Sequence, residues 1–451
     1  MNMTNQNLAD RDLAVLWHPC TQMKDHEHVP IIPIKKGQGV WLEDFDGNRY
    51  LDAISSWWVN LFGHANPVIN AALKDQLDTL EHVIFAGFTH ESGIKLAEKL
   101  VEITPPGLNR CFYADNGSAA VEVALKMSFH YWRNLGQTQK TKFITLENSY
   151  HGETLGALAV GNVALYKKTY APLLMDVITV PGPDCYFREP GESWADYSTR
   201  RFALMEHALA QHADSVCAVI IEPLVQCAGS MRMYDPVYLK CLRAACDNYN
   251  VHLIADEVAV GFGRTGTLFA CEQAAISPDF MCLSKGLTGG YLPLSAVLTT
   301  DRIYQAFYDD YTKLTAFLHS HSYTGNALAC RAGLATIGIF QQQGIIEKNK
   351  RLAKVMAKVA ARFNDHLNVA EVRQTGMIVA IELVKNKATR EPYPWQERRG
   401  FKMHQFALTK GVLLRPLGNV IYFMPPYVIT EAELELLADV AWQAIGYAVN
   451  N

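Results

Sequence analysis

The stretch from Val251 to Gly290 constrains this chain more than any other part of its sequence. Within it, one apolar run stops at Asp256, and a second, from Phe280 to Leu283, is followed two positions later by Lys285. Short apolar runs that end in charge are typical of buried parallel strands at the carboxyl edge of a sheet. Open α/β sheets bind their ligands at that edge. The pattern therefore predicts an acid and an amine that face one crevice from two strand ends.

Other interpretations of this stretch remain open at this point. An apolar run that ends in Asp-Glu resembles the magnesium-binding strand of P-loop ATPases, but the chain has no G-x-x-x-x-G-K-[ST] loop. Gly261, Gly263 and Gly266 spell the dinucleotide fingerprint G-x-G-x-x-G, but no amphipathic helix clearly opens after them. A plain ion pair between Asp256 and Lys285 is the simplest alternative.

The composition is that of an ordinary globular protein. Of 451 residues, 49% are hydrophobic and 19% are charged, which argues against disorder and leads us to expect two domains. The net charge of −4 gives no reason to expect a nucleic acid or an anionic membrane as partner. No apolar run approaches the length of a membrane span, and the polar start MNMTNQNLADRD does not resemble a signal peptide.

Cysteine usage predicts a reducing compartment. Ten cysteines are scattered without C-x-x-C spacing, and Cys217 and Cys282 lie in apolar runs. We therefore expect buried thiols, with neither a disulfide framework nor a metal site. The expected location is the cytoplasm.

The order of patterns along the chain predicts an α/β fold. From Arg110 to Asp256, apolar strand-like runs alternate with helical patterns, which indicates a mostly parallel sheet covered by helices. After about residue 335 the pattern changes to a long helix and a few further strands. We therefore expect a large domain over 60–335 and a smaller α/β domain over 336–451, joined by an N-terminal segment, 1–59.

A turn at Asn116, Gly117 and Ser118 stands between an apolar run and a helical pattern. The free N–H groups of a helix's first turn and the helix dipole form a site for phosphate, and glycine permits close approach. Ser118 by itself favours a simpler role as a helix cap.

Four kinds of group hold pyridoxal phosphate in an enzyme: a lysine for a Schiff base, an acid at the pyridine nitrogen, a phosphate cradle and an aromatic face. This chain offers Lys285, Asp256, the turn at Gly117-Ser118, and Tyr150 after the apolar run KFITLE. An aromatic ring at a strand end can stack on a pyridine ring, although a packed tyrosine is the commoner case. The four groups together favour this cofactor.

With IADEVAVGFGRTG and LSKG, the chain resembles the class III, omega-type aminotransferases of pyridoxal-phosphate fold type I. The resemblance implies that fold, and a homodimer with active sites at its interface. It implies that Lys285 carries the cofactor and acts as a base, that Asp256 keeps the pyridine nitrogen protonated, and that Tyr150 stacks on the ring and faces the substrate. For His151, a structural and a functional role remain level. The other implied cofactor contacts are Gly117 and Ser118 at the phosphate, Glu222 nearby, where it can balance an arginine, His321, and Ser322 at the phosphate of the neighbouring subunit.

The motifs S-S-W-W and R-P-L-G…I-Y-F-M-P-P-Y are similar to one branch of this family, which works in biotin biosynthesis. That branch converts 8-amino-7-oxononanoate to 7,8-diaminononanoate in a ping-pong reaction, with S-adenosylmethionine as amino donor. An arginine after an apolar strand suits bidentate capture of a carboxylate, with an exposed salt bridge as its alternative. The implied substrate contacts are Cys20, Trp57, Tyr150, Lys285, Ser320, Arg415 and Tyr422.

Two departures from that branch leave the amino donor open. Cys20 stands where many relatives have tyrosine, and His319 to Tyr323 read H-S-H-S-Y where many have H-G-P-T-F. The form H-S-Y-T-G-N and the segment KATREPYP resemble relatives that take the amino group from lysine. The runner-up is another omega-aminotransferase, acting on ornithine, 4-aminobutyrate or a polyamine. A non-catalytic or nicotinamide-binding α/β protein is the alternative from a different class.

Overall fold

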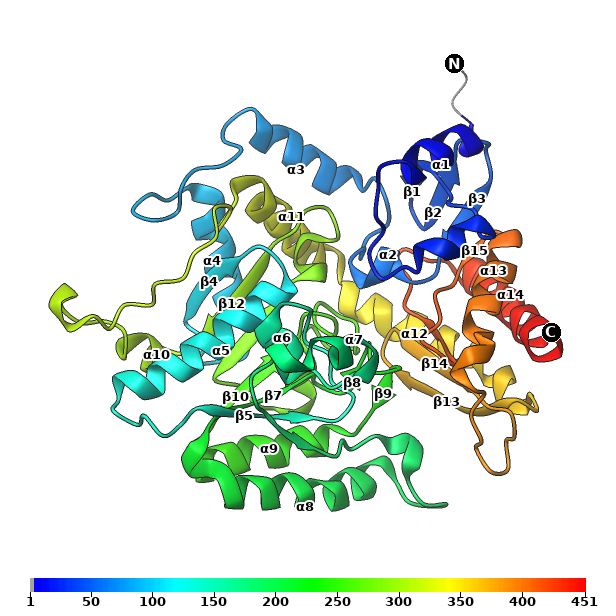
Figure 1. Ribbon diagram of the computed structural model, residues 1–451. Coiled ribbons are helices and arrows are strands. Elements are labelled where there is room, and N and C mark those ends of the chain that lie inside the picture. Colours follow the sequence, from blue (N-terminus) through cyan, green and yellow to red (C-terminus); the bar gives the residue numbers. More distant parts are fainter. Residues whose placement is uncertain (1–3) are drawn as a thin grey trace. The chain divides into compact units, whose positions relative to one another are not determined.

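A computed structural model describes residues 4–451 of the chain (Figure 1). The chain divides into two compact units. The boundaries predicted from the sequence, after residues 59 and 335, fall inside unit 1 and unit 2 respectively. Unit 1 takes the chain up to Pro67 with Lys354–Val372 and Val379–Asn451, and unit 2 takes Val68–Ala353 and Arg373–Ile378.

Local contacts explain where these boundaries lie. Beyond residue 59, the carbonyl of Leu61 accepts a hydrogen bond from the Tyr427 amide at 2.7 Å, which ties this segment to unit 1. Residue 335 lies within α11 (Ala327–Gln343), which packs against α4 (Glu91–Ile103) in unit 2. The assignment of functional domains stays a prediction.

Unit 2 is built on a seven-stranded sheet in the order β4-β12-β11-β10-β7-β5-β6. The pairs β10–β11, β7–β10, β5–β7 and β5–β6 are parallel, and β12 runs antiparallel to both of its neighbours. The predicted mostly parallel sheet is therefore confirmed. The strands are β4 (Arg110–Ala114), β5 (Lys142–Leu146), β6 (Ile178–Val180), β7 (Val216–Ile221), β10 (His252–Asp256), β11 (Phe280–Leu283) and β12 (Ser295–Thr299), with a separate hairpin of β8 (Val225–Gln226) and β9 (Arg232–Met233).

Several helices of unit 2 pack on this sheet with buried apolar residues, among them α5 (Gly117–Asn134) and α9 (Pro236–Asn248). Helix α5 packs against the central strands of the sheet. It follows the N-cap Asn116, whose side chain accepts a hydrogen bond from the Ala119 amide. Its buried residues, among them Val121 and Leu125, share one core with residues of β7, β10, β11 and β12. Each such side chain contributes about 1.5–3 kcal/mol by leaving water. The other helices are α3 (Pro67–Leu77), α6 (Leu155–Val160), α7 (Ala164–Lys167), α8 (Trp194–His212) and α10 (Asp301–Gln305), with α4 and α11 as above.

Unit 1 contains two small sheets, β1-β2-β3-β15 and β13-β14-β16. Strand β15, near the C-terminus, pairs in parallel with β3 of the N-terminal segment, with Val412 opposite Leu51. Both ends of the chain therefore build this smaller α/β unit, as the sequence predicts. Its elements are α1 (Asn5–Leu13), β1 (Ile34–Gln38), β2 (Trp41–Asp44), β3 (Arg49–Asp52), α2 (Ser55–Trp58), α13 (Arg399–Thr409), β15 (Val412–Leu413), β16 (Val420–Phe423) and α14 (Glu431–Asn450). A boundary of the units falls within α3, α12 (Ile345–Ala361), β13 (Val369–Thr375) and β14 (Ile378–Leu383).

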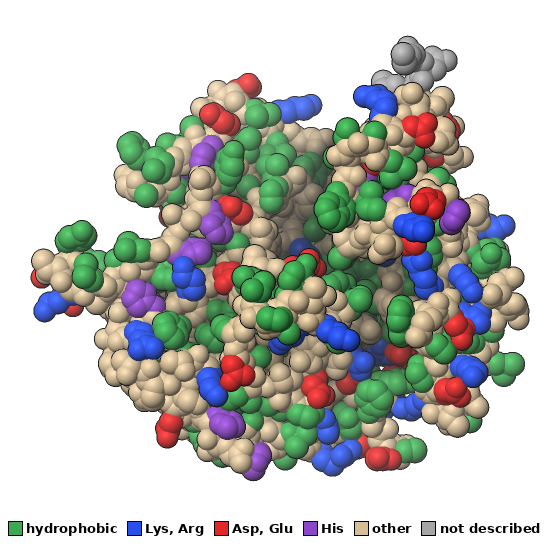
Figure 2. All heavy atoms as spheres, viewed as in Figure 1, with side chains coloured by type: hydrophobic (Ala, Val, Ile, Leu, Met, Phe, Trp, Pro, Cys, Tyr) green, Lys and Arg blue, Asp and Glu red, His purple; other side chains and the backbone are tan. Residues whose placement is uncertain are grey.

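The surface and the thiols match the composition. On the face that Figure 2 shows, Lys and Arg side chains lie among Asp and Glu side chains. Within residues 4–451, no helix is both long enough and apolar enough to cross a bilayer, and no three His, Cys, Asp or Glu side chains are grouped to hold a metal ion. The predicted buried thiols are confirmed at Cys185, Cys217, Cys227, Cys246, Cys271, Cys282 and Cys330.

Candidate active site

Asp256 and Lys285 reach the same edge of the unit 2 sheet. Asp256 ends β10 and lies in register with Cys282 on the parallel strand β11. Lys285 follows β11 and opens a 3₁₀ turn, η6 (Lys285–Thr288), with a left-handed φ of 43°. The carboxyl of Asp256 is almost fully buried. The predicted acid and amine at neighbouring strand ends are therefore present.

The carboxyl group of Asp256 is held on both oxygens. The Nδ1 of His151 lies 2.7 Å from Oδ2, and the Val258 amide donates a hydrogen bond to Oδ1 at 3.0 Å. The His151 ring is buried, and its Nε2 has no hydrogen-bond partner among the described residues. His151 thus contacts the acid directly, and this geometry fixes the orientation of the carboxyl group.

The Lys285 amine is tuned by its surroundings. Burial lowers the pKa of Lys285 below its ordinary value, and the nearby groups Asp256, Cys227 and Glu222 partly offset that effect. A lower pKa leaves more of the amine neutral, which is the form that acts as a nucleophile or base. Because Asp256 and Lys285 have buried surroundings, they do not serve merely as exposed charges that keep a loop soluble.

Glu222 follows β7 at the same edge and is buried. Its carboxyl group accepts hydrogen bonds from the backbone amides of Tyr150 at 2.9 Å and Cys227 at 3.0 Å. Burial, and then the charge of Asp256, raise the pKa of Glu222 well above its ordinary value. The resemblance implies that Glu222 can balance an arginine. These two contacts are instead with backbone amides, and the one with the Tyr150 amide fixes the position of Tyr150.

The turn at the start of α5 differs in one detail from the sequence prediction. Asn116 is the N-cap of the helix, so a capping role for Ser118 is wrong. The Ser118 hydroxyl instead accepts a hydrogen bond from the Thr154 amide at 3.0 Å and lies 2.8 Å from the Thr154 hydroxyl. Ser118 is the second residue of the helix, whereas Asn116 has the extended backbone that an N-cap requires, and its side chain accepts a hydrogen bond from the Ala119 amide. A Cβ added to Gly117 would lie 2.7 Å from Val258 Cγ1, so a larger residue there would force the Val258 side chain to move.

Tyr150 follows β5 and is partly buried. Its hydroxyl donates a hydrogen bond to Glu153 at 3.0 Å, and its ring meets the ring of Tyr166 edge-on with centroids 5.5 Å apart. The ring therefore has a packed neighbour, and its stacking on a cofactor stays a prediction.

The segment from His319 to Tyr323 lies against two other loops of unit 2. The Nδ1 of His321 is 3.3 Å from a carboxylate oxygen of Asp115, next to the α5 turn. His82 Nε2 is 2.8 Å from the carbonyl oxygen of Ser322. The side chains of Ser320 and Ser322 are exposed. The predicted roles of these residues toward phosphate and substrate are compatible with that exposure and stay predictions.

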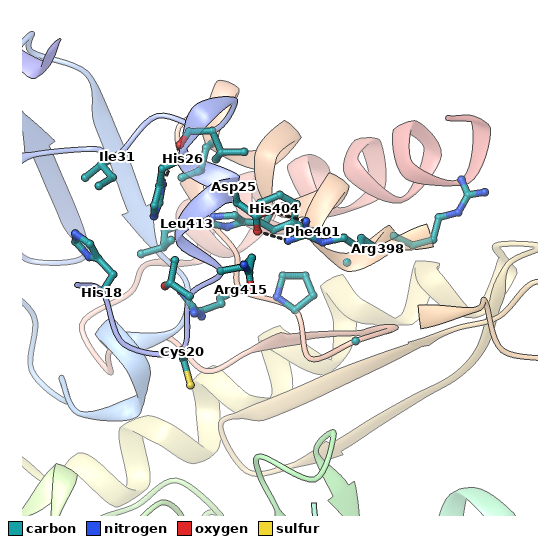
Figure 3. Close-up of a pocket in the computed structure, with 18 of the residues that line it drawn as sticks. His18, Cys20, Asp25, His26, Ile31, Arg398, Phe401, His404, Leu413 and Arg415 are labelled. Carbon is teal, nitrogen blue, oxygen red and sulfur yellow. Dashed lines mark hydrogen bonds and ion pairs between the residues drawn. The ribbon is translucent and has the colours of Figure 1, made fainter. Parts of the chain in front are cut away.

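Unit 1 holds the remaining predicted substrate residues. The Arg415 guanidinium lies 4.5 Å from the centre of the Trp57 ring, and Trp57 has a left-handed φ of 72°. The Trp58 indole donates a hydrogen bond to the Tyr422 hydroxyl at 3.0 Å, and Tyr422 is 1% exposed. Cys20 and Arg415 line one pocket of about 630 Å³ within this unit (Figure 3).

Comparison with known proteins places this geometry in a family. The model of the family "Aminotransferase class-III" matches residues 22–445. The chain belongs to this family. It is 49% identical to an adenosylmethionine-8-amino-7-oxononanoate aminotransferase of Helicobacter pylori over 95% of both chains, and 44% identical to one of Geobacter sulfurreducens over 96% of both.

Solved structures of class III aminotransferases share the fold. The crystal structure of an adenosylmethionine-8-amino-7-oxononanoate aminotransferase from Methanocaldococcus jannaschii matches with a TM-score of 0.93 and 39% identity, covering 98% of this chain and 99% of that one. An omega transaminase of Pseudomonas jessenii, solved in complex with PMP, matches with a TM-score of 0.93 and 28% identity, covering 98% of each chain. The predicted fold type I architecture is confirmed, and the nicotinamide-binding and non-catalytic alternatives are excluded.

Class III aminotransferases use pyridoxal phosphate, and the residues of unit 2 fit that group. The fit rests on the donor set: a partly buried amine at Lys285, a buried and oriented carboxyl at Asp256, and a helix N-terminus at Gly117. Gly117 adjoins the strand end directly, since its added Cβ would lie 3.6 Å from the Cβ of Ser284. The helix N-terminus at Gly117 suits the phosphate of the cofactor, the Asp256 carboxyl suits its pyridine nitrogen, and the Lys285 amine suits its carbonyl carbon.

Three further residues contribute to this site, namely Asn116, Val258 and Thr154. Asn116 caps α5, and its place three residues before Ala119 is a capping signal that could have been used. Val258 and Thr154 act through backbone amides, on Asp256 and Ser118 respectively. Backbone amides carry no residue-type signal, so only the fold reveals these two.

Proposed function

We propose that this chain is the aminotransferase of biotin biosynthesis that converts 8-amino-7-oxononanoate to 7,8-diaminononanoate. The observation that carries the proposal is full-length similarity to enzymes of that name, combined with Lys285 and Asp256 at neighbouring strand ends. S-adenosylmethionine is the proposed amino donor, as the names of those relatives state for their own reaction. Lysine is the alternative donor.

In this proposal the residues of unit 2 hold the cofactor and move the proton. Lys285 would hold pyridoxal phosphate through its amine, and that amine, when free, would act as the general base for the donor's Cα proton, a role worth roughly 10²–10⁴-fold in rate. Bound pyridoxal phosphate supplies the electron sink for that proton's removal. Asp256 keeps the proton on the pyridine nitrogen, and His151 orients Asp256. Gly117, Ser118 and His321 would hold the phosphate, together with Ser322 of the neighbouring subunit. Tyr150 would cover the ring, and Glu222 holds the backbone of Tyr150.

The acceptor contacts are proposed as follows. Arg415 binds the carboxylate of 8-amino-7-oxononanoate through two parallel hydrogen bonds. Trp57 and Tyr150 cover its aliphatic chain, which gains about 0.8 kcal/mol for each methylene buried. Cys20, Ser320 and Tyr422 complete the proposed substrate contacts.

We further propose a homodimer with active sites at the interface, in which Ser322 reaches the phosphate of the neighbouring subunit. Exposure of the Ser322 side chain supports this proposal. The cytoplasm is the proposed compartment, supported by the seven buried thiols.

One assay tests the proposed reaction. Purified protein is incubated with 8-amino-7-oxononanoate and, separately, with S-adenosylmethionine, lysine, ornithine or 4-aminobutyrate, and 7,8-diaminononanoate is quantified by mass spectrometry. We expect product with S-adenosylmethionine. Product with lysine alone would replace the donor, and no product with any donor would refute the proposal.

A further inference from the structure

The N-terminal strap, defined as residues 17–32, has little regular structure of its own. It contains no strand among its residues, all of which the structure describes, and its one regular element is a 3₁₀ turn, η1 (Met23–Glu27). Trp17 at its start is 87% exposed. Hydrogen bonds of Thr21 and His26 are made within the strap, to the carbonyls of Pro19 and Val29. A segment of this kind opens at low free energy unless a specific contact holds it.

The strap nevertheless forms part of a pocket wall. It supplies Cys20, Thr21 and Gln22 to the pocket of about 630 Å³, and the rest of the lining includes residues of α13 and the segment around Arg415 (Figure 3). The position of the strap therefore sets the width of the space in front of the Arg415 guanidinium.

An ion pair joins the strap to the start of α13. Arg398 donates to Asp25 with both terminal nitrogens, Nη1 to Oδ1 at 2.9 Å and Nη2 to Oδ2 at 2.6 Å. The same guanidinium lies 4.1 Å from the centre of the Phe401 ring, one turn into α13. These hydrogen bonds lower the pKa of Asp25. The Arg398 guanidinium group is stacked on one face and hydrogen-bonded along one edge, so its orientation is restricted. It therefore defines the angle at which the strap meets α13.

We propose that Asp25 and Arg398 are positioning residues for the acceptor substrate: their ion pair holds the N-terminal strap in place as a wall of the Arg415 pocket. This proposal rests on the proposed function, in which Arg415 binds the acceptor's carboxylate. Neither residue touches the reacting atoms. Loss of the ion pair frees the strap. Part of the binding free energy of each substrate is then spent on ordering the strap as a wall of the pocket.

Hydrogen exchange tests the structural half of the proposal. Asp25→Asn keeps the shape of the side chain but removes its charge, and Asp25→Glu restores a carboxylate. The matched control is Asp439→Asn, which breaks an exposed ion pair with Arg362 in the same unit (2.7 Å) but lies outside the pocket lining. In the holoenzyme, amide exchange of peptides covering residues 17–32 should rise about two- to fivefold in Asp25→Asn, fall back in Asp25→Glu, and stay at the parent value in Asp439→Asn. Unchanged exchange in Asp25→Asn would overturn the proposal.

Kinetics test the functional half. We expect Asp25→Asn to raise the KM for 8-amino-7-oxononanoate about two- to fivefold, with kcat and the rate of the single-turnover donor half-reaction unchanged. Combining Asp25→Arg with Arg398→Asp, which reverses the pair, should recover part of the loss. Faster exchange without a KM change, or equal losses in both half-reactions, would overturn the positioning role. Arg415→Ala, run in parallel, separates the two ideas: if it leaves the acceptor's KM unchanged, the proposed carboxylate contact fails and the strap result is judged on exchange alone.

Discussion

Lys285 combines two features that cost stability, which indicates that its place is fixed by function. A non-glycine residue at a φ of 43° is rare, and a lysine amine loses favourable hydration when it is buried. Strained backbone of this kind persists only where the surrounding structure holds it and costs about 1–3 kcal/mol. Here the holding is done by the buried strand β11 before it and by the Ser284 hydroxyl, which donates a hydrogen bond to the Leu294 carbonyl at 2.7 Å.

Replacement of Lys285 by alanine should abolish transamination while leaving the fold intact. We expect turnover to fall by at least about 10²–10⁴-fold, because the general base is lost. The melting temperature should stay level or rise, since a buried amine is removed. After borohydride reduction, mass spectrometry should find the cofactor on the Lys285 peptide of the parent and on no peptide of the variant. Lys240→Ala, on the exposed face of α9, is the control that keeps both activity and label. Near-normal turnover in Lys285→Ala would end the assignment.

At the scale of elements, strands that depend on an apolar pattern can be predicted from the sequence. Contacts between residues that are far apart along the chain cannot. Strands β10 and β11 could be predicted because each contains a short apolar run, which ends at Asp256 in β10 and is followed by Ser284 and Lys285 in β11. The contact of His151 with Asp256 could not, because 105 positions separate them along the chain. The same holds for Asp25 and Arg398, which lie 373 positions apart. The alternative role of Ser118 as a helix cap is wrong because Asn116 in the same turn caps the helix, while the predicted contact of Ser118 with phosphate stays a prediction.

Strand β10 also carries a histidine that makes unit 2 sensitive to acid. His252 opens the strand, is 1% exposed, stacks on Trp132 with centroids 4.6 Å apart, and has Nδ1 2.9 Å from the Ser128 hydroxyl. Burial lowers the pKa of His252 from 6.5 to about 3. Between those values the unfolded chain binds a proton that the folded chain does not. Stability from this group is therefore present above pH 6.5 and is lost as the pH falls toward 3.

Substitution of His252 by asparagine should flatten the acid limb of the stability profile. Asparagine keeps a polar atom near the Nδ1 position but cannot take up the proton. The parent should lose about 1.4 kcal/mol per pH unit below the ordinary histidine pKa through this group, and the variant should not. Calorimetric melting temperatures between pH 7 and pH 5 measure the two slopes. His207→Asn, exposed on α8, should keep the parent's slope. Parallel slopes for parent and His252→Asn would contradict the argument.

At the scale of the whole molecule, the predicted chemistry is divided between the two compact units. Unit 2 carries Lys285, Asp256 and the α5 turn, which are the groups suited to the cofactor. Unit 1 carries Arg415, the group proposed for the acceptor's carboxylate, together with Trp57, while Tyr150 and Ser320 in unit 2 are further proposed substrate contacts. Cofactor residues were the easier to predict, because a lysine and an acid at strand ends are tied to a fold-wide pattern. Substrate residues came from resemblance alone, since an arginine after a short strand is equally typical of a surface ion pair.

This division allows the acceptor site to be tested apart from the cofactor site. If Arg415 binds the carboxylate of 8-amino-7-oxononanoate, Arg415→Ala should raise the KM for that acceptor roughly ten- to a hundredfold, because a charge-assisted bidentate pair is worth about 1.5–3 kcal/mol. Arg415→Lys should recover little, since an ammonium group cannot reproduce the planar fork. The donor half-reaction, followed in a single turnover, should change by no more than a few-fold. If Arg415 serves only to pack on Trp57, from which its guanidinium lies 4.5 Å away, both half-reactions and the melting temperature should fall together. Equal losses in the two half-reactions would remove Arg415 from the substrate site.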